Sequence, residues 1–307
     1  MSAPKAFIIH LERAVGRRAS VEALRAGLPI ESGVLPAVDG RSLSHEAVKA
    51  AYVRARFSPR YPFALGLPEI GAFLSHRAAW SQIVAEGLDY GCVFEDDAAI
   101  DSALFASLLD FAAAERARWE YVLMPASGLE PSGKIMARRG EFSLLRPRAP
   151  PLRAIGQIVS RAAAERLLAL TAPFDRPVDT FLQMAWISGI TLLVATPTPI
   201  RDVSSSTGGT TVQRRRMGLV RRLRHEAMRP IYRAQVLALY RRHLALAGDT
   251  ACGMKYRLAS EAAAGLTQVQ LQKGNRGKFP GGGGIPSAEK YDSSWRCRLT
   301  RLIRWNA

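Results

Sequence analysis

A buried strand that ends in three acidic residues constrains the fold more than any other part of the chain. The apolar run at residues 90–94 (YGCVF) is followed at once by Glu95, Asp96 and Asp97, a pattern typical of a buried strand with a polar end. Side chains alternate along a strand, so Glu95 and Asp97 are expected on one face. Clustered carboxylates repel one another, and a divalent cation relieves that cost. Glu95 and Asp97 are therefore candidate ligands of Mg²⁺ or Mn²⁺, with a substrate diphosphate supplying further ligands.

A simpler interpretation is that the acids only solvate the strand end, with Asp101 capping the next helix. The surrounding pattern bears on this choice, because strands and helices are predicted to alternate up to about residue 200. That order favours an α/β fold with a mostly parallel sheet flanked by helices, in which ligands bind outside the carboxyl ends of the strands. Strands are predicted at residues 7–11, 32–38, 90–94, 121–124, 142–145, 154–160 and 191–195, and residues 125–151 are otherwise predicted to be a loop.

The positive charge of the chain is concentrated in its last third. The net charge is +17, and residues 201–307 carry 21 Lys and Arg against 6 Asp and Glu. We therefore predict two regions: a near-neutral folded domain at residues 1–202, and a basic helical region at residues 203–307 with glycine-rich linkers. The basic region includes a predicted helix at residues 213–244, which Pro230 is expected to kink or break. Such a charge distribution indicates an anionic partner.

The anionic partner is predicted to be a membrane surface. Near the C-terminus, Trp295, Leu299, Leu302 and Ile303 fall on one helical face, which is typical of an interfacial helix, although a solvated tail fits the same residues. Nucleic acid is disfavoured, because zinc-finger spacing, aromatic RNA-binding motifs and recognition-helix signatures are absent. No apolar run approaches the ~20 residues of a spanning helix, and the start of the sequence does not resemble a secretory signal. We expect a cytoplasmic protein, peripheral on the inner face of the cytoplasmic membrane.

Several separated motifs together resemble the family 25 glycosyltransferases. This family is typified by bacterial lipooligosaccharide galactosyltransferases and is related to collagen galactosyltransferases. The resemblance covers about residues 5–200. It rests on residues 8–13 (IIHLER) with Arg17 and Arg18, residues 37–40 (AVDG), residues 69–76 (EIGAFLSH) with Trp80, residues 94–97 (FEDD), residues 155–160 (IGQIVS) and residues 177–179 (PVD).

The resemblance implies a GT-A fold, the fold of nucleotide-diphosphosugar transferases. It implies a UDP-sugar donor, UDP-galactose being the first choice, with Mn²⁺ or Mg²⁺ as the cofactor. Glu95 and Asp97 then occupy the outer positions of the family's D-x-D-like motif, and Asp96 the middle. The sequence departs from the family pattern at three positions: His10 stands in place of Asn, Glu12 in place of Asp, and Gln157 in place of an aromatic residue.

The resemblance also assigns residues to the nucleotide and to the reaction. Residues expected at the nucleotide are His10, Leu11, Arg13, Arg17, Arg18, Ser75, His76 and Asp96. For Ser75 and His76 a scaffold role is the alternative. An inverting transfer needs a base for the acceptor hydroxyl, and Asp179 is the first candidate, with Asp39 in reserve. Asp179 could instead serve as the N-cap of a following helix.

The expected activity is metal-dependent inverting transfer of a sugar, first of all galactose, to a saccharide or glycolipid acceptor of lipooligosaccharide, lipopolysaccharide or another surface glycan. Two other functions stay open. A metal-dependent phosphohydrolase or nucleotidyltransferase could use the same acids without a sugar acceptor. A non-enzymatic protein could bind nucleic acid through its basic third, with a steep dependence on salt.

Overall fold

The computed structural model describes residues 3–126, 128, 131–204 and 219–248. The predicted linkers at residues 204–209 and 281–284 lie largely or wholly outside these residues, as does the predicted interfacial helix near the C-terminus. A helix long and apolar enough to cross a membrane is absent from the part of the chain that the structure describes.

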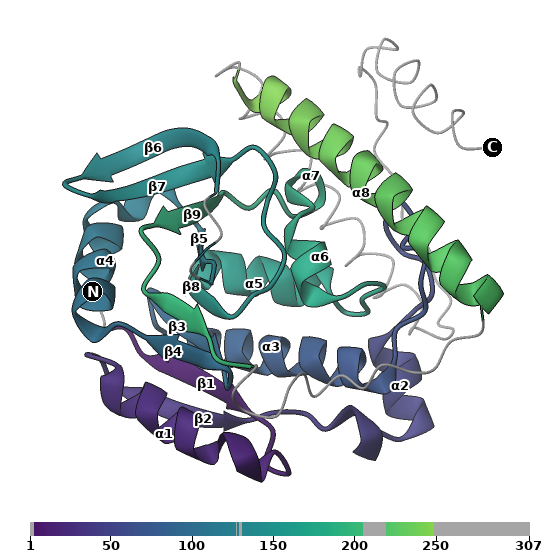
Figure 1. Cartoon of the computed structure of the whole chain (residues 1–307), viewed down its shortest axis with the longest axis horizontal. Coiled ribbons are helices and arrows are strands. Elements are labelled where there is room, and N and C mark those ends of the chain that lie inside the picture. The colour runs from purple at the N-terminus through teal and green to yellow at the C-terminus, as the bar shows by residue number, and fades with distance from the viewer. Residues whose placement is uncertain (1–2, 127, 129–130, 205–218, 249–307) are drawn as a thin grey trace, which may run out of the picture. The chain divides into compact units, whose positions relative to one another are not determined.

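The centre of the molecule is an eight-stranded mixed sheet in the order β2-β1-β3-β8-β5-β9-β7-β6 (Figure 1). β8 and β7 are antiparallel to the other six strands. Six of the eight strands thus point in the same direction, and the sheet is mostly parallel, as predicted. A separate two-stranded sheet pairs β10 with β4. The strands are β1 (Ala6–His10), β2 (Ser32–Pro36), β3 (Tyr90–Glu95), β4 (Ala98–Ile100), β5 (Tyr121–Met124), β6 (Gly133–Arg139), β7 (Phe142–Pro147), β8 (Gly156–Ser160), β9 (Leu192–Thr196) and β10 (Ile200–Asp202).

Helices cover both faces of the large sheet, and each face has its own apolar cluster. On one face α1 and α4 pack with Val21, Leu24 and Phe105 against the strands; on the other, α3, α5 and α6 pack with Phe73, Leu167 and Phe181. The result is the three-layer α/β architecture that alternating strands and helices predict. The helices are α1 (Arg18–Gly27), α2 (His45–Ala51), α3 (Leu67–Ala85), α4 (Ser102–Ala114), α5 (Arg161–Leu170), α6 (Val178–Leu182), α7 (Ala185–Ser188) and α8 (Leu219–Gly248), with short 3-10 turns η1 (Val15–Arg17), η2 (Gly40–Ser42) and η3 (Arg116–Arg118).

β3 lies where the sequence places it and brings its acidic end to one edge of the sheet. It pairs in parallel with β1, with Ile9 opposite Glu95, and antiparallel with β8. Residues Tyr90–Phe94 are buried and Glu95 is half-buried. The carboxyl ends of β1 and β3 therefore meet at the same edge. Asp101 caps α4 by accepting the amide of Leu104 at 3.0 Å, as the simpler interpretation of this stretch predicts.

Two local predictions are wrong. Residues 125–151 are not a loop around one short strand, because β6 and β7 form an antiparallel hairpin there. β6 is an edge strand whose residues are mostly exposed, so it lacks the apolar alternation that identifies a half-buried strand. In addition, α8 runs through Pro230 without a break. Pro230 is exposed, a position where the lost backbone hydrogen bond can be replaced by water.

α8 packs on the rest of the molecule along one stripe. Tyr232, Val236 and Tyr240, spaced four residues apart, are buried, which is the pattern of a helix with one apolar face. The Tyr232 hydroxyl accepts a hydrogen bond from Arg176 Nη1 at 2.7 Å, and the Tyr240 hydroxyl donates to the Pro147 carbonyl at 2.9 Å. At least this part of the basic region thus belongs to the same compact unit as the sheet, while the assignment of the remainder stays a prediction.

Candidate active site

A cavity of about 300 Å³ opens at the carboxyl ends of β1 and β3. Its walls also come from the turn after β2, from α3, from the segment before β8, from α6 and from the end of β10. Most of the predicted site residues line it, although they come from segments far apart in the chain. They are Leu11, Arg13, Arg17, Asp39, Ser75, His76, Glu95, Asp96, Asp97 and Asp179. His10 and Arg18 lie outside the lining.

Asp97 is a half-buried carboxylate without a full set of hydrogen-bond partners. Its Oδ1 is buried without a hydrogen-bond partner among the described residues, and its Oδ2 is 3.5 Å from Arg17 Nη1. Burial, and then the nearby charge of Glu95, raise the pKa of Asp97 to about 6. A bound cation would offset both the cost of burying this charge and its repulsion by Glu95.

The side chains present suit a cation that takes most of its ligands from elsewhere. The described residues hold no cluster of three or more His, Cys, Asp or Glu side chains arranged for a metal ion. Mg²⁺ and similar ions are commonly held by one or two carboxylates together with substrate phosphates and water. Glu95 and Asp97 fit that mode of binding, because Glu95 is about one-third exposed to the cavity and Asp97 retains a free buried oxygen.

Asp96 has a different environment from its two neighbours. Its Oδ2 lies 2.9 Å from His10 Nδ1, and its Oδ1 accepts a hydrogen bond from Arg17 Nη1. All three side chains are buried. This cluster ties η1 to the end of β3. The same contacts turn His10 away from the cavity lining, where a nucleotide contact was expected.

Asp39 is held by an arginine and by the backbone. Arg13 Nε donates to its Oδ2 at 2.6 Å, and the Arg41 amide donates to its Oδ1 at 3.0 Å. These hydrogen bonds, that of Arg13 first, hold the pKa of Asp39 below its ordinary value. A carboxylate stabilised in this way is a weaker proton acceptor, which argues against Asp39 as the base.

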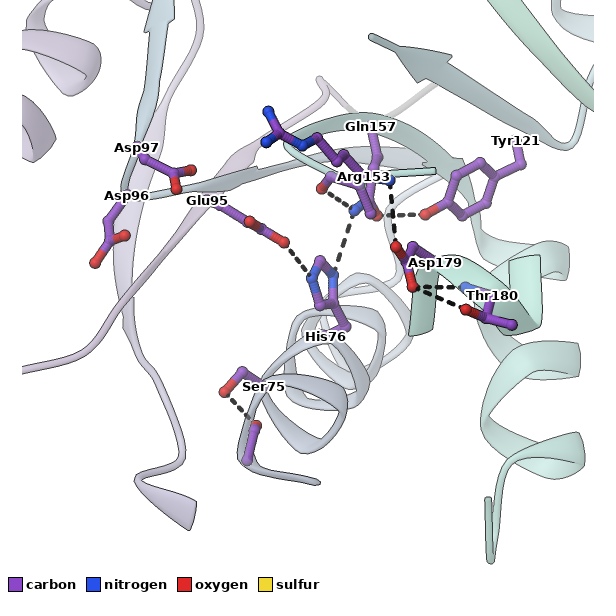
Figure 2. Close-up of polar contacts among 12 residues, drawn as sticks. Ser75, His76, Glu95, Asp96, Asp97, Tyr121, Arg153, Gln157, Asp179 and Thr180 are labelled. Carbon is purple, nitrogen blue, oxygen red and sulfur yellow. Dashed lines mark hydrogen bonds and ion pairs between the residues drawn. The ribbon is translucent and has the colours of Figure 1, made fainter. Parts of the chain in front are cut away.

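Ser75 and His76 leave α3 in different directions and have different tasks. The Ser75 hydroxyl donates to the Gly71 carbonyl and accepts the Val38 amide, both at 2.8 Å. Ser75 thereby holds the turn after β2 against the helix, which is a scaffold role. His76 instead points toward the acidic strand end, with Nε2 3.1 Å from Glu95 Oε1 (Figure 2).

Asp179 lies within the first turn of α6, two residues after the N-cap. The N-cap is Pro177. The Asp179 carboxylate still accepts the Thr180 amide at 2.7 Å and, on its other oxygen, the Arg153 amide at 3.4 Å (Figure 2). It is half-buried and lines the cavity. The carboxylate is therefore oriented by two backbone amides and remains accessible to a ligand.

Sequence reasoning missed Arg153 and Asp202. Both line the cavity, and the Arg153 guanidinium forms an ion pair with the Asp202 carboxylate. Arg153 has a φ of 73°, a left-handed conformation that is uncommon for residues other than glycine and that clusters at functional sites. Neither the conformation nor the pairing over 49 residues leaves a signal in the local sequence.

Acids at the ends of parallel strands, facing arginines across a cavity, define a site compatible with a nucleotide-sugar transferase. A family model described as glycosyltransferase family 25 (LPS biosynthesis protein) matches residues 3–182. This match covers more than half of the chain, and the chain belongs to that family.

Some of the curated relatives are named inactive, and others are named as galactosyltransferases. The probable inactive glycosyltransferase 25 family member 3 of Bos taurus is 28% identical over 197 residues, covering 59% of this chain and 31% of its own length. The inactive glycosyltransferase 25 family member 3 of Homo sapiens is 30% identical, covering 57% and 30%. Procollagen galactosyltransferase 2 of Homo sapiens is 26% identical, covering 59% and 30%. The chain thus spans about a third of the length of these relatives.

Proposed function

We propose that the protein is a metal-dependent inverting glycosyltransferase with a GT-A-type fold. It would move a sugar, first of all galactose, from a UDP-sugar to a saccharide acceptor of lipooligosaccharide, lipopolysaccharide or another surface glycan. The observation that carries the proposal is the unpartnered buried oxygen of Asp97 beside Glu95, in a cavity that also holds Asp179. Family membership and the galactosyltransferase names among the relatives support the choice of reaction.

Each wall of the cavity has a task in this reaction. Glu95 and Asp97 would hold Mn²⁺ or Mg²⁺, which when bound stabilises the negative charge of the departing diphosphate. Arg13 and Arg153 line the cavity and provide guanidinium groups suited to phosphate oxygens. Asp179 would accept the proton of the acceptor hydroxyl as its oxygen attacks the anomeric carbon. The amides of Thr180 and Arg153 fix the direction of that carboxylate.

A two-stage experiment tests the proposal. UDP-sugars are first screened by thermal shift with and without Mn²⁺, since a bound donor raises stability by mass action. The selected donor is then used in a transfer assay with wild type and Asp179→Asn. The asparagine still accepts the Thr180 amide but cannot take a proton, so transfer should fall by roughly 10² or more while donor binding persists. Near-normal turnover of the variant would exclude Asp179 as the base.

The names of the relatives indicate a second possible result of this experiment, in which the protein binds a donor but does not transfer the sugar. Several relatives are named inactive, and a chain of that kind could bind a donor without transferring it. Donor-dependent stabilisation with no transfer to any saccharide acceptor would indicate such a binding protein. Release of UDP or phosphate without an acceptor would instead indicate a phosphohydrolase.

We further propose that the basic region holds the enzyme against an anionic inner-membrane surface, where a glycolipid acceptor lies. On α8, Arg233 and Arg242 are exposed, while Tyr232, Val236 and Tyr240 of the same helix are buried. Each basic residue near such a surface contributes about 1 kcal/mol, so replacing both with glutamine should weaken binding to anionic vesicles about 30-fold at low salt. A control variant carries Arg25→Gln and Arg138→Gln, two exposed arginines outside α8. If this variant loses as much affinity for anionic vesicles as the α8 variant, binding depends only on net charge.

A further inference from the structure

Gln157 is a fully buried amide in the middle of the sheet. A buried side-chain amide is costly unless both its oxygen and its nitrogen are hydrogen-bonded. The Tyr121 hydroxyl donates to Gln157 Oε1. On the other end, Nε2 lies 2.5 Å from the Ala154 carbonyl oxygen and 3.3 Å from His76 Nδ1. The amide therefore joins the strands to the histidine that contacts Glu95 (Figure 2).

These contacts determine where His76 carries its proton. The Ala154 carbonyl can only accept a hydrogen bond, so the NH₂ end of Gln157 must face it. The same NH₂ group faces His76 Nδ1, which must then accept as well. The proton of the neutral ring is left on Nε2, which lies 3.1 Å from Glu95 Oε1. His76 consequently donates to the Glu95 carboxylate.

We propose that Gln157 is a positioning residue for Glu95 and acts through His76. By fixing the Nε2–H form of the ring, it lets His76 hold one carboxylate oxygen of Glu95 and leaves the other for the cavity. The inference rests on the proposed function in one respect, the role of Glu95 as a ligand of the divalent cation. Groups that orient a metal ligand in this way have large effects, and their loss typically weakens metal binding or activity by 10- to 100-fold.

Replacing Gln157 with leucine removes the constraint without adding a charge. The donor that faces Nδ1 is then gone and only the Glu95 carboxylate still favours the Nε2–H form, so the share of the Nδ1–H form should rise. When the proton is on Nδ1, the lone pair of Nε2 faces Glu95 Oε1 and the two repel, so the carboxylate loses its fixed direction. Tyr121→Phe is the matched control, because it removes the other hydrogen bond of Gln157 and leaves both contacts of the NH₂ group.

The tautomer can be measured directly by long-range ¹H–¹⁵N NMR of the histidine rings, with the His76 signal identified by its loss in His76→Gln. We expect Nε2–H in wild type and in Tyr121→Phe, and a mixture of both forms in Gln157→Leu. A wild-type ring protonated on Nδ1 would overturn the inference, whatever the variants do. The wild-type tautomer can be measured without metal or donor, and it does not require that a variant of Gln157 folds.

Metal binding is measured separately, by electron paramagnetic resonance of free Mn²⁺ in the presence of UDP. Gln157→Leu, checked for folding by circular dichroism, should bind Mn²⁺ about 10- to 100-fold more weakly, and Tyr121→Phe should bind like wild type. Equal affinity in Gln157→Leu and wild type would overturn the positioning role. Wild type that shows Nε2–H but binds no Mn²⁺ would overturn the proposed function and leave the hydrogen-bond assignment intact.

Discussion

Replacing Asp97 with asparagine is expected to stabilise the metal-free protein and to remove its response to a cation. The carboxylate is half-buried, and its burial, followed by the charge of Glu95, raises its pKa from 3.8 to about 6. Each tenfold change in proton affinity corresponds to about 1.36 kcal/mol, so at neutral pH the ionised carboxylate costs the folded state at most about 3 kcal/mol. Asparagine has nearly the same shape and carries no charge.

The sign of the pH dependence follows from the direction of the shift. Because the pKa of Asp97 is higher in the folded protein than in the unfolded chain, the folded protein binds the proton more tightly. Wild type should therefore lose stability as the pH rises from about 4 to above 6, whereas this loss should be absent in Asp97→Asn. The stabilities of the two proteins should converge below about pH 4.

Urea unfolding in EDTA at several pH values measures the free energy of unfolding of wild type and of Asp97→Asn. The difference between the two proteins should be largest above pH 6. Asp39→Asn is the control, since Asp39 lines the same cavity but has a lowered pKa and should not stabilise the protein. With Mn²⁺ and UDP at about 100 times the dissociation constant, wild type should gain about 2.7 kcal/mol and Asp97→Asn nothing. A variant that is less stable than wild type in EDTA at pH 7.5 would refute this account of Asp97.

Three further predictions concern the framework of the site. Gly71→Ala should destabilise the fold by about 1–3 kcal/mol in urea unfolding, because the added Cβ would lie 2.5 Å from the Val38 carbonyl; an unchanged midpoint would contradict this close approach. Tyr232→Phe should cost about 1–3 kcal/mol, because it leaves the buried Arg176 Nη1 without this acceptor; a melting temperature equal to that of wild type would argue against the docking of α8. Burial alone would raise the pKa of Asp175, but hydrogen bonds from Arg176 and from two backbone amides outweigh burial and lower the pKa. The ionised Asp175 should therefore stabilise the folded protein at neutral pH, and this contribution should be lost as the pH falls below about 3.8. In Asp175→Asn the free energy of unfolding should consequently fall less steeply at acid pH than in wild type.

The sequence alone was sufficient for the features that depend on local pattern. The apolar run before Glu95 predicts β3, and the alternation of strands and helices predicts a mostly parallel sheet flanked by helices. Both are confirmed, because burial on two faces imposes an apolar run that can be read directly. Asp39, His76 and Asp179 are assigned to the site through the resemblance to family 25 and not by local pattern alone, and all three line the cavity.

Only the tertiary structure distinguishes residues that are neighbours in the sequence. Asp96 and Asp97 are adjacent and chemically identical, yet Asp96 is bound by Arg17 and His10, 79 and 86 residues away, while Asp97 keeps a free buried oxygen. Gln157 likewise meets His76 over 81 residues. The charge state, direction and availability of these groups depend on partners that arrive by folding, and no local periodicity specifies which partner arrives.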